Sequence, residues 1–313
     1  MYAIETCNLK KVYRGRPVVD GFSMHVPRGA IYGFVGCNGA GKSTVMKMID
    51  GLAAPTAGEI RLFGGEGDGG SIRVEATHPS SRQRIGALIE SPGLIPAMSV
   101  WDNLMAKALA LGVADAPARC REMLDLVGLA EARSKAAKRC SQGMKQRLGI
   151  GLALIGSPDL LLLDEPFNGL DPEGTQAMRR MLMRLNEMFG ITLVISSHVL
   201  DQLDRMATHY GVIVEGTLVR EMTAAQVRED CGDSLVVRTT DPELTLAQLE
   251  QAFPDGRFRM EADRSLRLTG SFDPAAVAEA LRGIDATVLE LTEIRRDIED
   301  YFVELMEGGA SHV

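Results

Sequence analysis

A glycine-rich loop with one lysine is the first part of the chain whose residue types could do chemistry. The sequence GCNGAGKST, Gly36 to Thr44, directly follows the apolar segment IYGFV and leads into the helical pattern KSTVMKMIDGL. Glycines let the backbone turn sharply so that its N–H groups point at phosphate oxygens, while Lys42 supplies positive charge and Ser43 can hold Mg²⁺. The residues expected to contact a nucleotide here are Gly36, Asn38, Gly39, Gly41, Lys42, Ser43 and Thr44.

Two carboxylates at the end of a second apolar segment supply the rest of a hydrolytic site. In LLLLDEP, Asp164 would reach Mg²⁺ through its water shell and Glu165 would polarise the attacking water. NGLD follows and ends at Asp171, and LVISSH places His198 at the end of a further apolar segment. A single histidine at a strand end is more often structural. At this spacing from the phosphate loop and the carboxylates, we predict a catalytic role for His198 beside Glu165.

These groups need a scaffold of strands and helices, and the hydrophobic patterns predict one. Residues 1–226 read as an α/β domain in which short apolar strands run into helices or polar loops. Between about 92 and 147 strand patterns give way to helical ones, which predicts an inserted helical subdomain. Residues 227–313 combine alternating segments with helical ones and predict a small accessory α+β domain. The Gly- and Ser-rich segment 63–83 is interpreted as a surface loop.

Composition excludes several classes of protein. The 313 residues are 45% hydrophobic and 24% charged, as in ordinary globular proteins, and the net charge of -8 argues against a nucleic-acid partner. Five scattered cysteines without metal-ligand spacing favour a reducing compartment. The most apolar run, LGIGLALIG, is far shorter than the ~20 residues that span a bilayer, and the N-terminus has no signal-peptide pattern. We therefore expect a cytosolic chain that reaches a membrane only through a partner.

A third motif lies between the phosphate loop and the carboxylates. CSQGMKQRL, which starts at Cys140, resembles the LSGGQ signature of ABC-type ATPases. Ser141 and Gly143 match that signature, while Cys140, Gln142 and Met144 depart from it. The departures are tolerable because the working groups are a hydroxyl and backbone N–H groups at a helix N-terminus. A plain helix cap at Ser141 is the simpler alternative for the motif taken by itself.

The order of the motifs decides between these readings. Phosphate loop, signature, paired carboxylates, NGLD and histidine follow one another as they do in ABC transporter nucleotide-binding domains, which residues 2 to about 222 resemble. The resemblance implies a P-loop NTPase with a helical subdomain, followed here by the small α+β domain. It also implies an ATP-dependent, Mg²⁺-requiring head-to-tail homodimer, with ATP held between one P-loop and the partner's signature. On this basis the dimer-interface residues are Ser141, Gln142, Gly143 and Asp171.

The same resemblance assigns roles to an aromatic ring and to an acid. Tyr13 occupies the position at which the family stacks an aromatic ring on adenine, an interaction of roughly 1–3 kcal/mol per base. Glu90, in RIGALIESPGL, stands where the family usually has a glutamine that touches the Mg²⁺ shell and opens the loop coupling to the membrane subunits. A carboxylate suits Mg²⁺ at least as well as an amide, so we expect Glu90 at the metal.

Glutamate at this position, the stretch SPGLIPAMSVWDNL and the C-terminal IEDYFVELMEGG together resemble the ATPases of bacitracin-resistance and lantibiotic-immunity exporters. The resemblance implies an ATPase that binds a separate permease at the cytoplasmic side of the cell membrane. A peptide-sensing ABC complex is the main alternative. Translation and DNA-repair ABC proteins fit less well, because the chain has one nucleotide domain and no sustained heptads.

Overall fold

The computed structural model describes residues 1–64, 72–73, 84–231, 234–254, 256–269, 272–282, 284, 286–294 and 298–310. The chain divides into two compact units: Met1–Thr223 with Leu305–Val313, and Ala224–Glu304. The structure thus groups the last residues with the first unit, whereas the sequence patterns assign everything after 226 to the second domain. Most of the surface loop expected at 63–83 lies outside the described residues.

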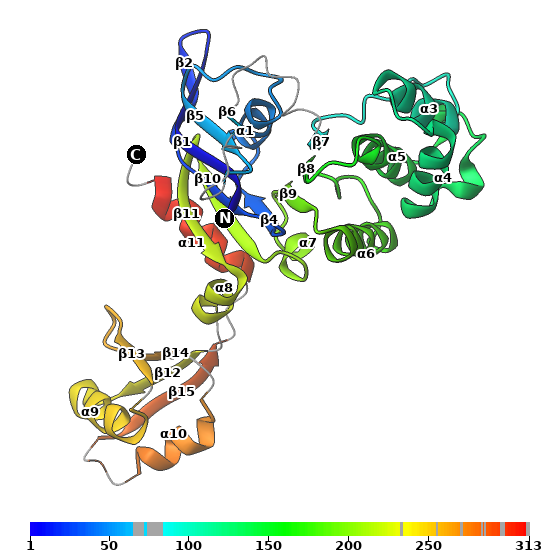
Figure 1. The fold of residues 1–313 in the computed structure, drawn as a ribbon. Helices are drawn as coiled ribbons and strands as arrows, with labels where there is room; N and C mark the ends of the chain where they lie inside the picture. Colours follow the sequence, from blue (N-terminus) through cyan, green and yellow to red (C-terminus); the bar gives the residue numbers. More distant parts are fainter. Residues whose placement is uncertain are drawn as a thin grey trace. The chain divides into compact units, whose positions relative to one another are not determined.

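A six-stranded sheet forms the centre of the first unit (Figure 1). Its strand order is β11 (Thr217–Thr223), β10 (His209–Val214), β4 (Ile31–Val35), β9 (Thr192–Ser197), β8 (Leu160–Asp164) and β7 (Ile85–Leu88). All neighbours pair in parallel except β10 and β11. Strands β4 and β9 are buried along their whole length, because helices and the second sheet cover both faces of a parallel sheet.

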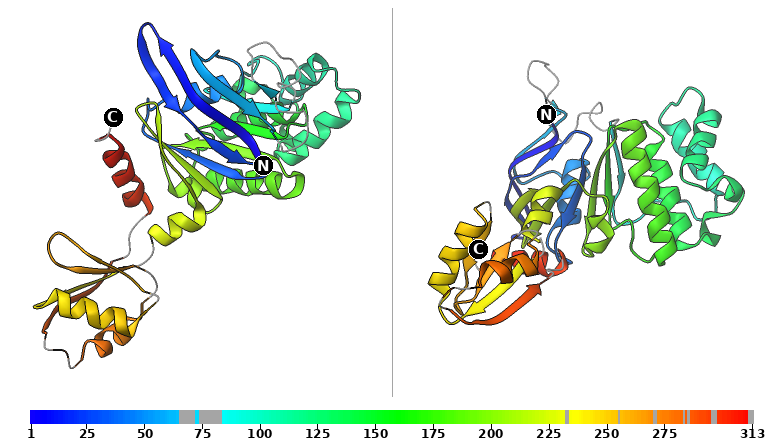
Figure 2. Two further views of the ribbon diagram at one scale, coloured as in Figure 1. Left: turned by 60° about the vertical axis from the view of Figure 1, so that its left-hand side comes forward. Right: turned by 90° about the horizontal axis from the view of Figure 1, so that it is seen from below.

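An antiparallel sheet packs beside it. It contains the long hairpin of β1 (Tyr2–Tyr13) and β2 (Arg16–Phe22), with β3 (His25–Pro27), β5 (Ala57–Leu62) and the short β6 (Ile72–Arg73). Figure 2 shows this hairpin in dark blue. One hydrophobic core joins the two sheets, with Phe22 of β2 against the ring of Phe34 of β4.

The helices of the first unit cover the parallel sheet and form the helical subdomain. They are α1 (Lys42–Ile49), α3 (Val100–Ala110), α4 (Ala116–Leu126), α5 (Gln142–Leu154), α6 (Pro172–Phe189) and the short α7 (Asp201–Asp204), with 3-10 turns at Ala130–Ala132 and Ala137–Arg139. Helices α3, α4 and α5 pack on one another, and α5 also packs on β7. The helical subdomain expected around residues 92–147 corresponds to this group.

Local sequence explains where these helices begin and end. Ser99 and Asp102 form a capping box at the start of α3, and Asp171 caps α6 ahead of a proline in its first turn. Helix α6 ends at Gly190, whose φ of 65° is the left-handed conformation that glycine adopts at little energetic cost. No helix in the described part of the chain is long and apolar enough to cross a membrane.

The second unit begins with α8 (Ala224–Asp230) and continues as a βαββαβ fold. Its elements are β12 (Ser234–Thr239), α9 (Pro242–Ala252), β13 (Arg257–Met260), β14 (Leu266–Thr269), α10 (Pro274–Ala280) and β15 (Val288–Ile294), followed by α11 (Ile298–Ala310), which continues into the first unit. The antiparallel strand order β13-β14-β12-β15 is that of a ferredoxin-like fold. Its apolar core includes Val237, Leu249 and Leu268.

Candidate nucleotide-hydrolysing site

The parallel sheet brings the chemical groups predicted from sequence to one edge. The phosphate loop follows β4, Asp164 ends β8, and His198 comes directly after β9. Because β4, β9 and β8 are neighbours in the parallel sheet, their carboxyl ends lie side by side. This is the edge at which open α/β sheets bind their ligands.

The phosphate loop has the backbone shape needed to cradle phosphate. Gly39 and Gly41 have φ of 84° and 109°, and α1 begins immediately after Gly41. A side chain at Gly36 would place its Cβ 2.5 Å from the carbonyl oxygen of Ile213 on β10, so only glycine fits there. The loop is pinned to β10–β11 by the N–H of Gly216, which donates to the carbonyl of Ala40 at 2.9 Å.

Lys42 lies in the centre of the loop with only 6% of its side chain exposed. Its Nζ donates to the carbonyl oxygens of Gly36 (2.6 Å) and Cys37 (3.2 Å). The same Nζ is 3.6 Å from Oε1 of Glu165. One buried cation therefore faces both the loop backbone and the carboxylate expected to activate water.

Glu165 is held between that cation and the histidine. Its Oε2 is 2.8 Å from Nδ1 of His198, and its Oε1 is buried yet accepts no hydrogen bond from the described residues. The backbone of Glu165 has a φ of 49°, which is unfavourable for any residue other than glycine. Such strain persists where surrounding structure fixes it, often at functional sites. The 2.8 Å distance shows that Glu165 and His198, predicted to act together, are in direct contact.

A buried serine, which sequence reasoning missed, ties the two carboxylate residues together. Ser196 of β9 lies directly opposite Asp164 in the parallel register and is fully buried. Its hydroxyl donates to Oδ1 of Asp164 at 2.6 Å and accepts the backbone N–H of Glu165 at 2.9 Å. The local signal was the serine pair in LVISSH, but only the pairing of β8 with β9 shows which serine meets the acids.

The groups present fit Mg²⁺ bound together with a nucleotide. Ser43 and Asp164 offer a hydroxyl and a carboxylate, which are hard oxygen ligands, and Mg²⁺ is usually held by one or two carboxylates plus substrate phosphates. No cluster of three or more His, Cys, Asp or Glu side chains suited to a metal occurs among the described residues. The donor set thus matches a metal whose other ligands come from phosphate and water.

The signature and NGLD segments meet on a separate surface. Ser141 caps α5 by accepting the N–H of Met144 at 3.3 Å, and a Cβ at Gly143 would lie 3.3 Å from Leu170. A Cβ at Gly169 would lie 3.4 Å from Gln142. Helix α5 packs on β7, α3 and α4, while α1, which follows the phosphate loop, packs on β8 and β2.

Tyr13 ends β1 at the tip of the hairpin and is 45% exposed. Lys11 Nζ lies 4.9 Å from the centre of its ring. The hairpin reaches the phosphate loop, since the carbonyl oxygen of Val18 would be 3.1 Å from a Cβ at Gly41. An exposed ring on a hairpin that borders the loop is compatible with the predicted stacking on adenine, which stays a prediction.

Glu90 follows β7, on the side of β8 away from β9. Leu88 pairs with Leu163, so Glu90 lies close to the level of Asp164 along the sheet edge. Its φ is 63°, and its carboxylate forms a short ion pair with Lys47 of α1. No motif in the sequence pointed to Lys47.

Comparisons with known proteins agree with this geometry. A family model described as ABC transporter matches residues 19–168. The bacitracin transport ATP-binding protein BcrA of Bacillus licheniformis is 36% identical over 309 residues, which cover 98% of each chain. This chain belongs to the ABC transporter ATP-binding proteins. The family inferred from the order of the motifs is thereby confirmed, and the protein is an ATPase of that family.

Two further similarities support the family and the fold. The lantibiotic transport ATP-binding protein SrtF of Streptococcus pyogenes is 40% identical over 214 residues, covering 68% of this chain and 88% of SrtF. A solved dimeric post-hydrolysis structure of the ATP-binding cassette MJ0796, bound to ADP and Pi, has a TM-score of 0.63 at 22% identity. It covers 71% of this chain and 98% of the cassette. The predicted P-loop ABC fold with a helical subdomain is confirmed.

Proposed function

We propose that this ABC ATPase drives an exporter that removes antimicrobial peptides or related drugs through a separate permease. The observation that carries the proposal is the extent of the similarity to BcrA, which includes both units of the chain and not the nucleotide domain alone. Glu90 in place of the usual glutamine, from which the sequence predicted this group, adds support. We place the chain at the cytoplasmic side of the cell membrane, bound through the permease.

In this function the site residues divide the work of hydrolysis. Lys42 and the loop N–H groups would bind the phosphates, Ser43 would hold Mg²⁺ and Asp164 would reach it through its water shell, and Glu165 would take the proton of the attacking water. His198, in contact with Glu165, keeps that carboxylate oriented towards the phosphate. Mg²⁺, when bound, neutralises charge that develops on the phosphate oxygens.

The signature surface suits a head-to-tail homodimer. The N-terminus of α5 presents backbone N–H groups and the Ser141 hydroxyl, a combination that binds phosphate. In the proposed dimer, this helix N-terminus serves the nucleotide bound by the partner. Asp171 caps α6 beside it, where Leu170 and Gly169 pack on the signature.

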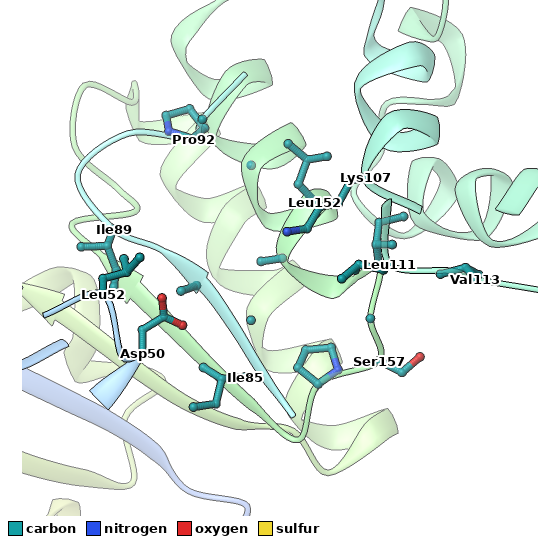
Figure 3. A pocket seen from close by; sticks show the side chains of 18 of the residues that line it. Asp50, Leu52, Ile85, Ile89, Pro92, Lys107, Leu111, Val113, Leu152 and Ser157 are labelled. Atoms are coloured by element: carbon teal, nitrogen blue, oxygen red, sulfur yellow. The ribbon is translucent and has the colours of Figure 1, made fainter. Parts of the chain in front are cut away.

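A groove beside β7 is suited to receive the permease. It has a volume of about 950 Å³ and is lined by residues of β7, α3, α4 and α5 and of the segments that follow α1, β7, α3 and α5. Figure 3 shows apolar side chains along it, including Ile89, Pro92, Leu111 and Leu152. The charged residues that line it are Asp50, Lys107 and Arg119. We assign it to a short, largely apolar cytoplasmic segment of the permease.

The groove is also connected to the catalytic edge. Ile89 and Ser91, which line it, flank Glu90 on both sides. A segment that enters or leaves the groove would therefore move the backbone next to Glu90. This connection would allow ATP binding and permease movement to influence each other.

Docking is tested by purifying the chain from membranes with its permease and comparing two leucine variants. Leu111 lines the groove and Leu109 does not, although both are exposed and lie at the end of α3. Leu111→Asp should lose the membrane protein, while Leu109→Asp should retain it. Equal retention by both variants would show that the permease binds elsewhere.

The cargo is tested in cells and in vesicles. Loss of the gene should increase sensitivity to bacitracin-type peptides, lantibiotics or related drugs, and wild-type protein should restore resistance where Glu165→Gln does not. The purified ATPase–permease complex in lipid vesicles should hydrolyse ATP faster when such a compound is added. Unchanged sensitivity to all of these compounds would refute the exporter proposal.

A further inference from the structure

The contact between Lys47 and Glu90 connects the helix after the phosphate loop with the end of β7. Lys47 is on α1, four residues after Ser43, so the two lie one turn apart on the same face. Helical side chains tilt towards the helix N-terminus, which directs Lys47 towards the turn that carries Ser43. The Glu90 carboxylate is thus paired with a lysine one helical turn from Ser43, the residue expected to hold Mg²⁺.

The charge of Glu90 is the property of this ion pair that bears on the nucleotide site. At the position where the family has a neutral glutamine, Glu90 carries a full negative charge. Lys47 adds one positive charge, so the pair sums to zero, as the amide would. The Lys47 side chain is 29% exposed and the Glu90 side chain 62% exposed.

The left-handed backbone at Glu90 is a second, independent observation. Its φ of 63° orients the residue after β7 out of the regular strand direction, and the N–H of Ser91 donates to the carbonyl of Ile89 at 2.8 Å across it. The turn fixes where the side chain leaves the backbone, and Lys47 fixes where the carboxylate goes.

We propose that Lys47 is the positioning residue for Glu90, compensating its charge and holding its carboxylate at the metal side of the nucleotide site. This inference rests on the Mg²⁺-dependent ATP binding of the proposed function. The consequence is specific: without Lys47, the carboxylate repels metal-free nucleotide and is tolerated only when Mg²⁺ is bound. Lys47 then sets how strongly nucleotide affinity depends on Mg²⁺.

The test measures binding, not hydrolysis. A fluorescent, non-hydrolysable ATP analogue is titrated at low ionic strength into each variant, once with Mg²⁺ and once with EDTA. The readout is the dissociation constant measured with EDTA divided by the one measured with Mg²⁺. Lys47→Met should raise this ratio by about five-fold or more, because one uncompensated charge then acts on the nucleotide through a partly solvated region. Added salt should reduce the difference between the variant and wild type.

Three further variants separate charge compensation from a structural role of the lysine. Lys47→Arg retains the charge and should keep the wild-type ratio. Glu90→Gln should lower the ratio, and the double variant Lys47→Met with Glu90→Gln should return it to within about two-fold of wild type. Lys10→Met serves as the matched control, because it removes a lysine paired with an acid, Asp20, elsewhere in the first unit.

A double variant that kept the raised ratio of Lys47→Met, or a ratio unchanged in Lys47→Met, would overturn the inference. Failure of the proposed Mg²⁺-dependent ATP binding would give a different result in the same titration. If wild-type protein bound the analogue equally well with Mg²⁺ and with EDTA, the Mg²⁺ dependence itself would be wrong.

Discussion

Ser196 offers the sharpest test of how the sheet positions its catalytic groups. Ser196→Ala removes a fully buried hydroxyl that donates to the Asp164 carboxylate at 2.6 Å and accepts the N–H of Glu165 at 2.9 Å. A hydrogen bond to a charged group contributes about 1.5–3 kcal/mol, and an orphaned buried donor costs about 1–3 kcal/mol. Because some of this loss is recovered by relaxation, we expect a decrease of about 2–4 kcal/mol in the free energy of unfolding.

Hydrolysis should fall more than stability alone would explain. Asp164 and Glu165 both lose the group that fixes them, and small misplacements of catalytic groups can cost about 10²-fold in rate. We therefore expect phosphate release at saturating ATP and Mg²⁺ to slow by about ten- to one-hundred-fold. Denaturant unfolding and steady-state phosphate release measure the two effects separately.

Thr192→Val is the matched control on the same strand. Thr192 is also buried, and its hydroxyl accepts the N–H of Gly29 at 3.0 Å, at the opposite end of β9 from the site. This variant should lose stability yet hydrolyse ATP at nearly the wild-type rate. If Ser196→Ala and Thr192→Val hydrolysed equally fast, the positioning role of Ser196 would be refuted.

Three other predictions address the base, the dimer and the core. Glu165→Gln should bind ATP but hydrolyse it about 10²–10⁴ times more slowly, and size-exclusion chromatography should show an ATP-bound dimer; a wild-type rate contradicts the assignment. Ser141→Arg should abolish turnover while the monomer keeps its nucleotide affinity, measured by fluorescence titration, and a large loss of affinity would contradict the head-to-tail arrangement. Tyr32→Phe should lose about 1.5–3 kcal/mol of stability, because the buried Tyr32 hydroxyl donates to Glu221 at 2.8 Å. Burial and the Glu221 carboxylate raise the pKa of Tyr32 well above its ordinary value. The extra stability of wild type over Tyr32→Phe should therefore be fully present below about pH 10 and lost as pH rises further. Unfolding curves of wild type and Tyr32→Phe that already coincide at pH 8 would refute this.

The sequence by itself determined the nucleotide chemistry and the family. A strand, a glycine-rich turn and a helix start form a phosphate loop through interactions among neighbouring residues, so Gly36–Thr44 could be read locally. The apolar runs IYGFV, LLLLD and TLVISS predicted buried strands for the same reason. The order of the motifs then identified the family without any knowledge of how the strands pair.

Only the tertiary structure decided which side chains meet. That β9 lies between β4 and β8 places Ser196 on Asp164 and His198 on Glu165, although these residues are more than thirty positions apart. Nothing near Lys47 in the sequence indicates that its partner is Glu90. Strand order and side-chain pairing of this kind depend on how the whole sheet packs against its helices, and a local pattern of residues carries no record of that packing.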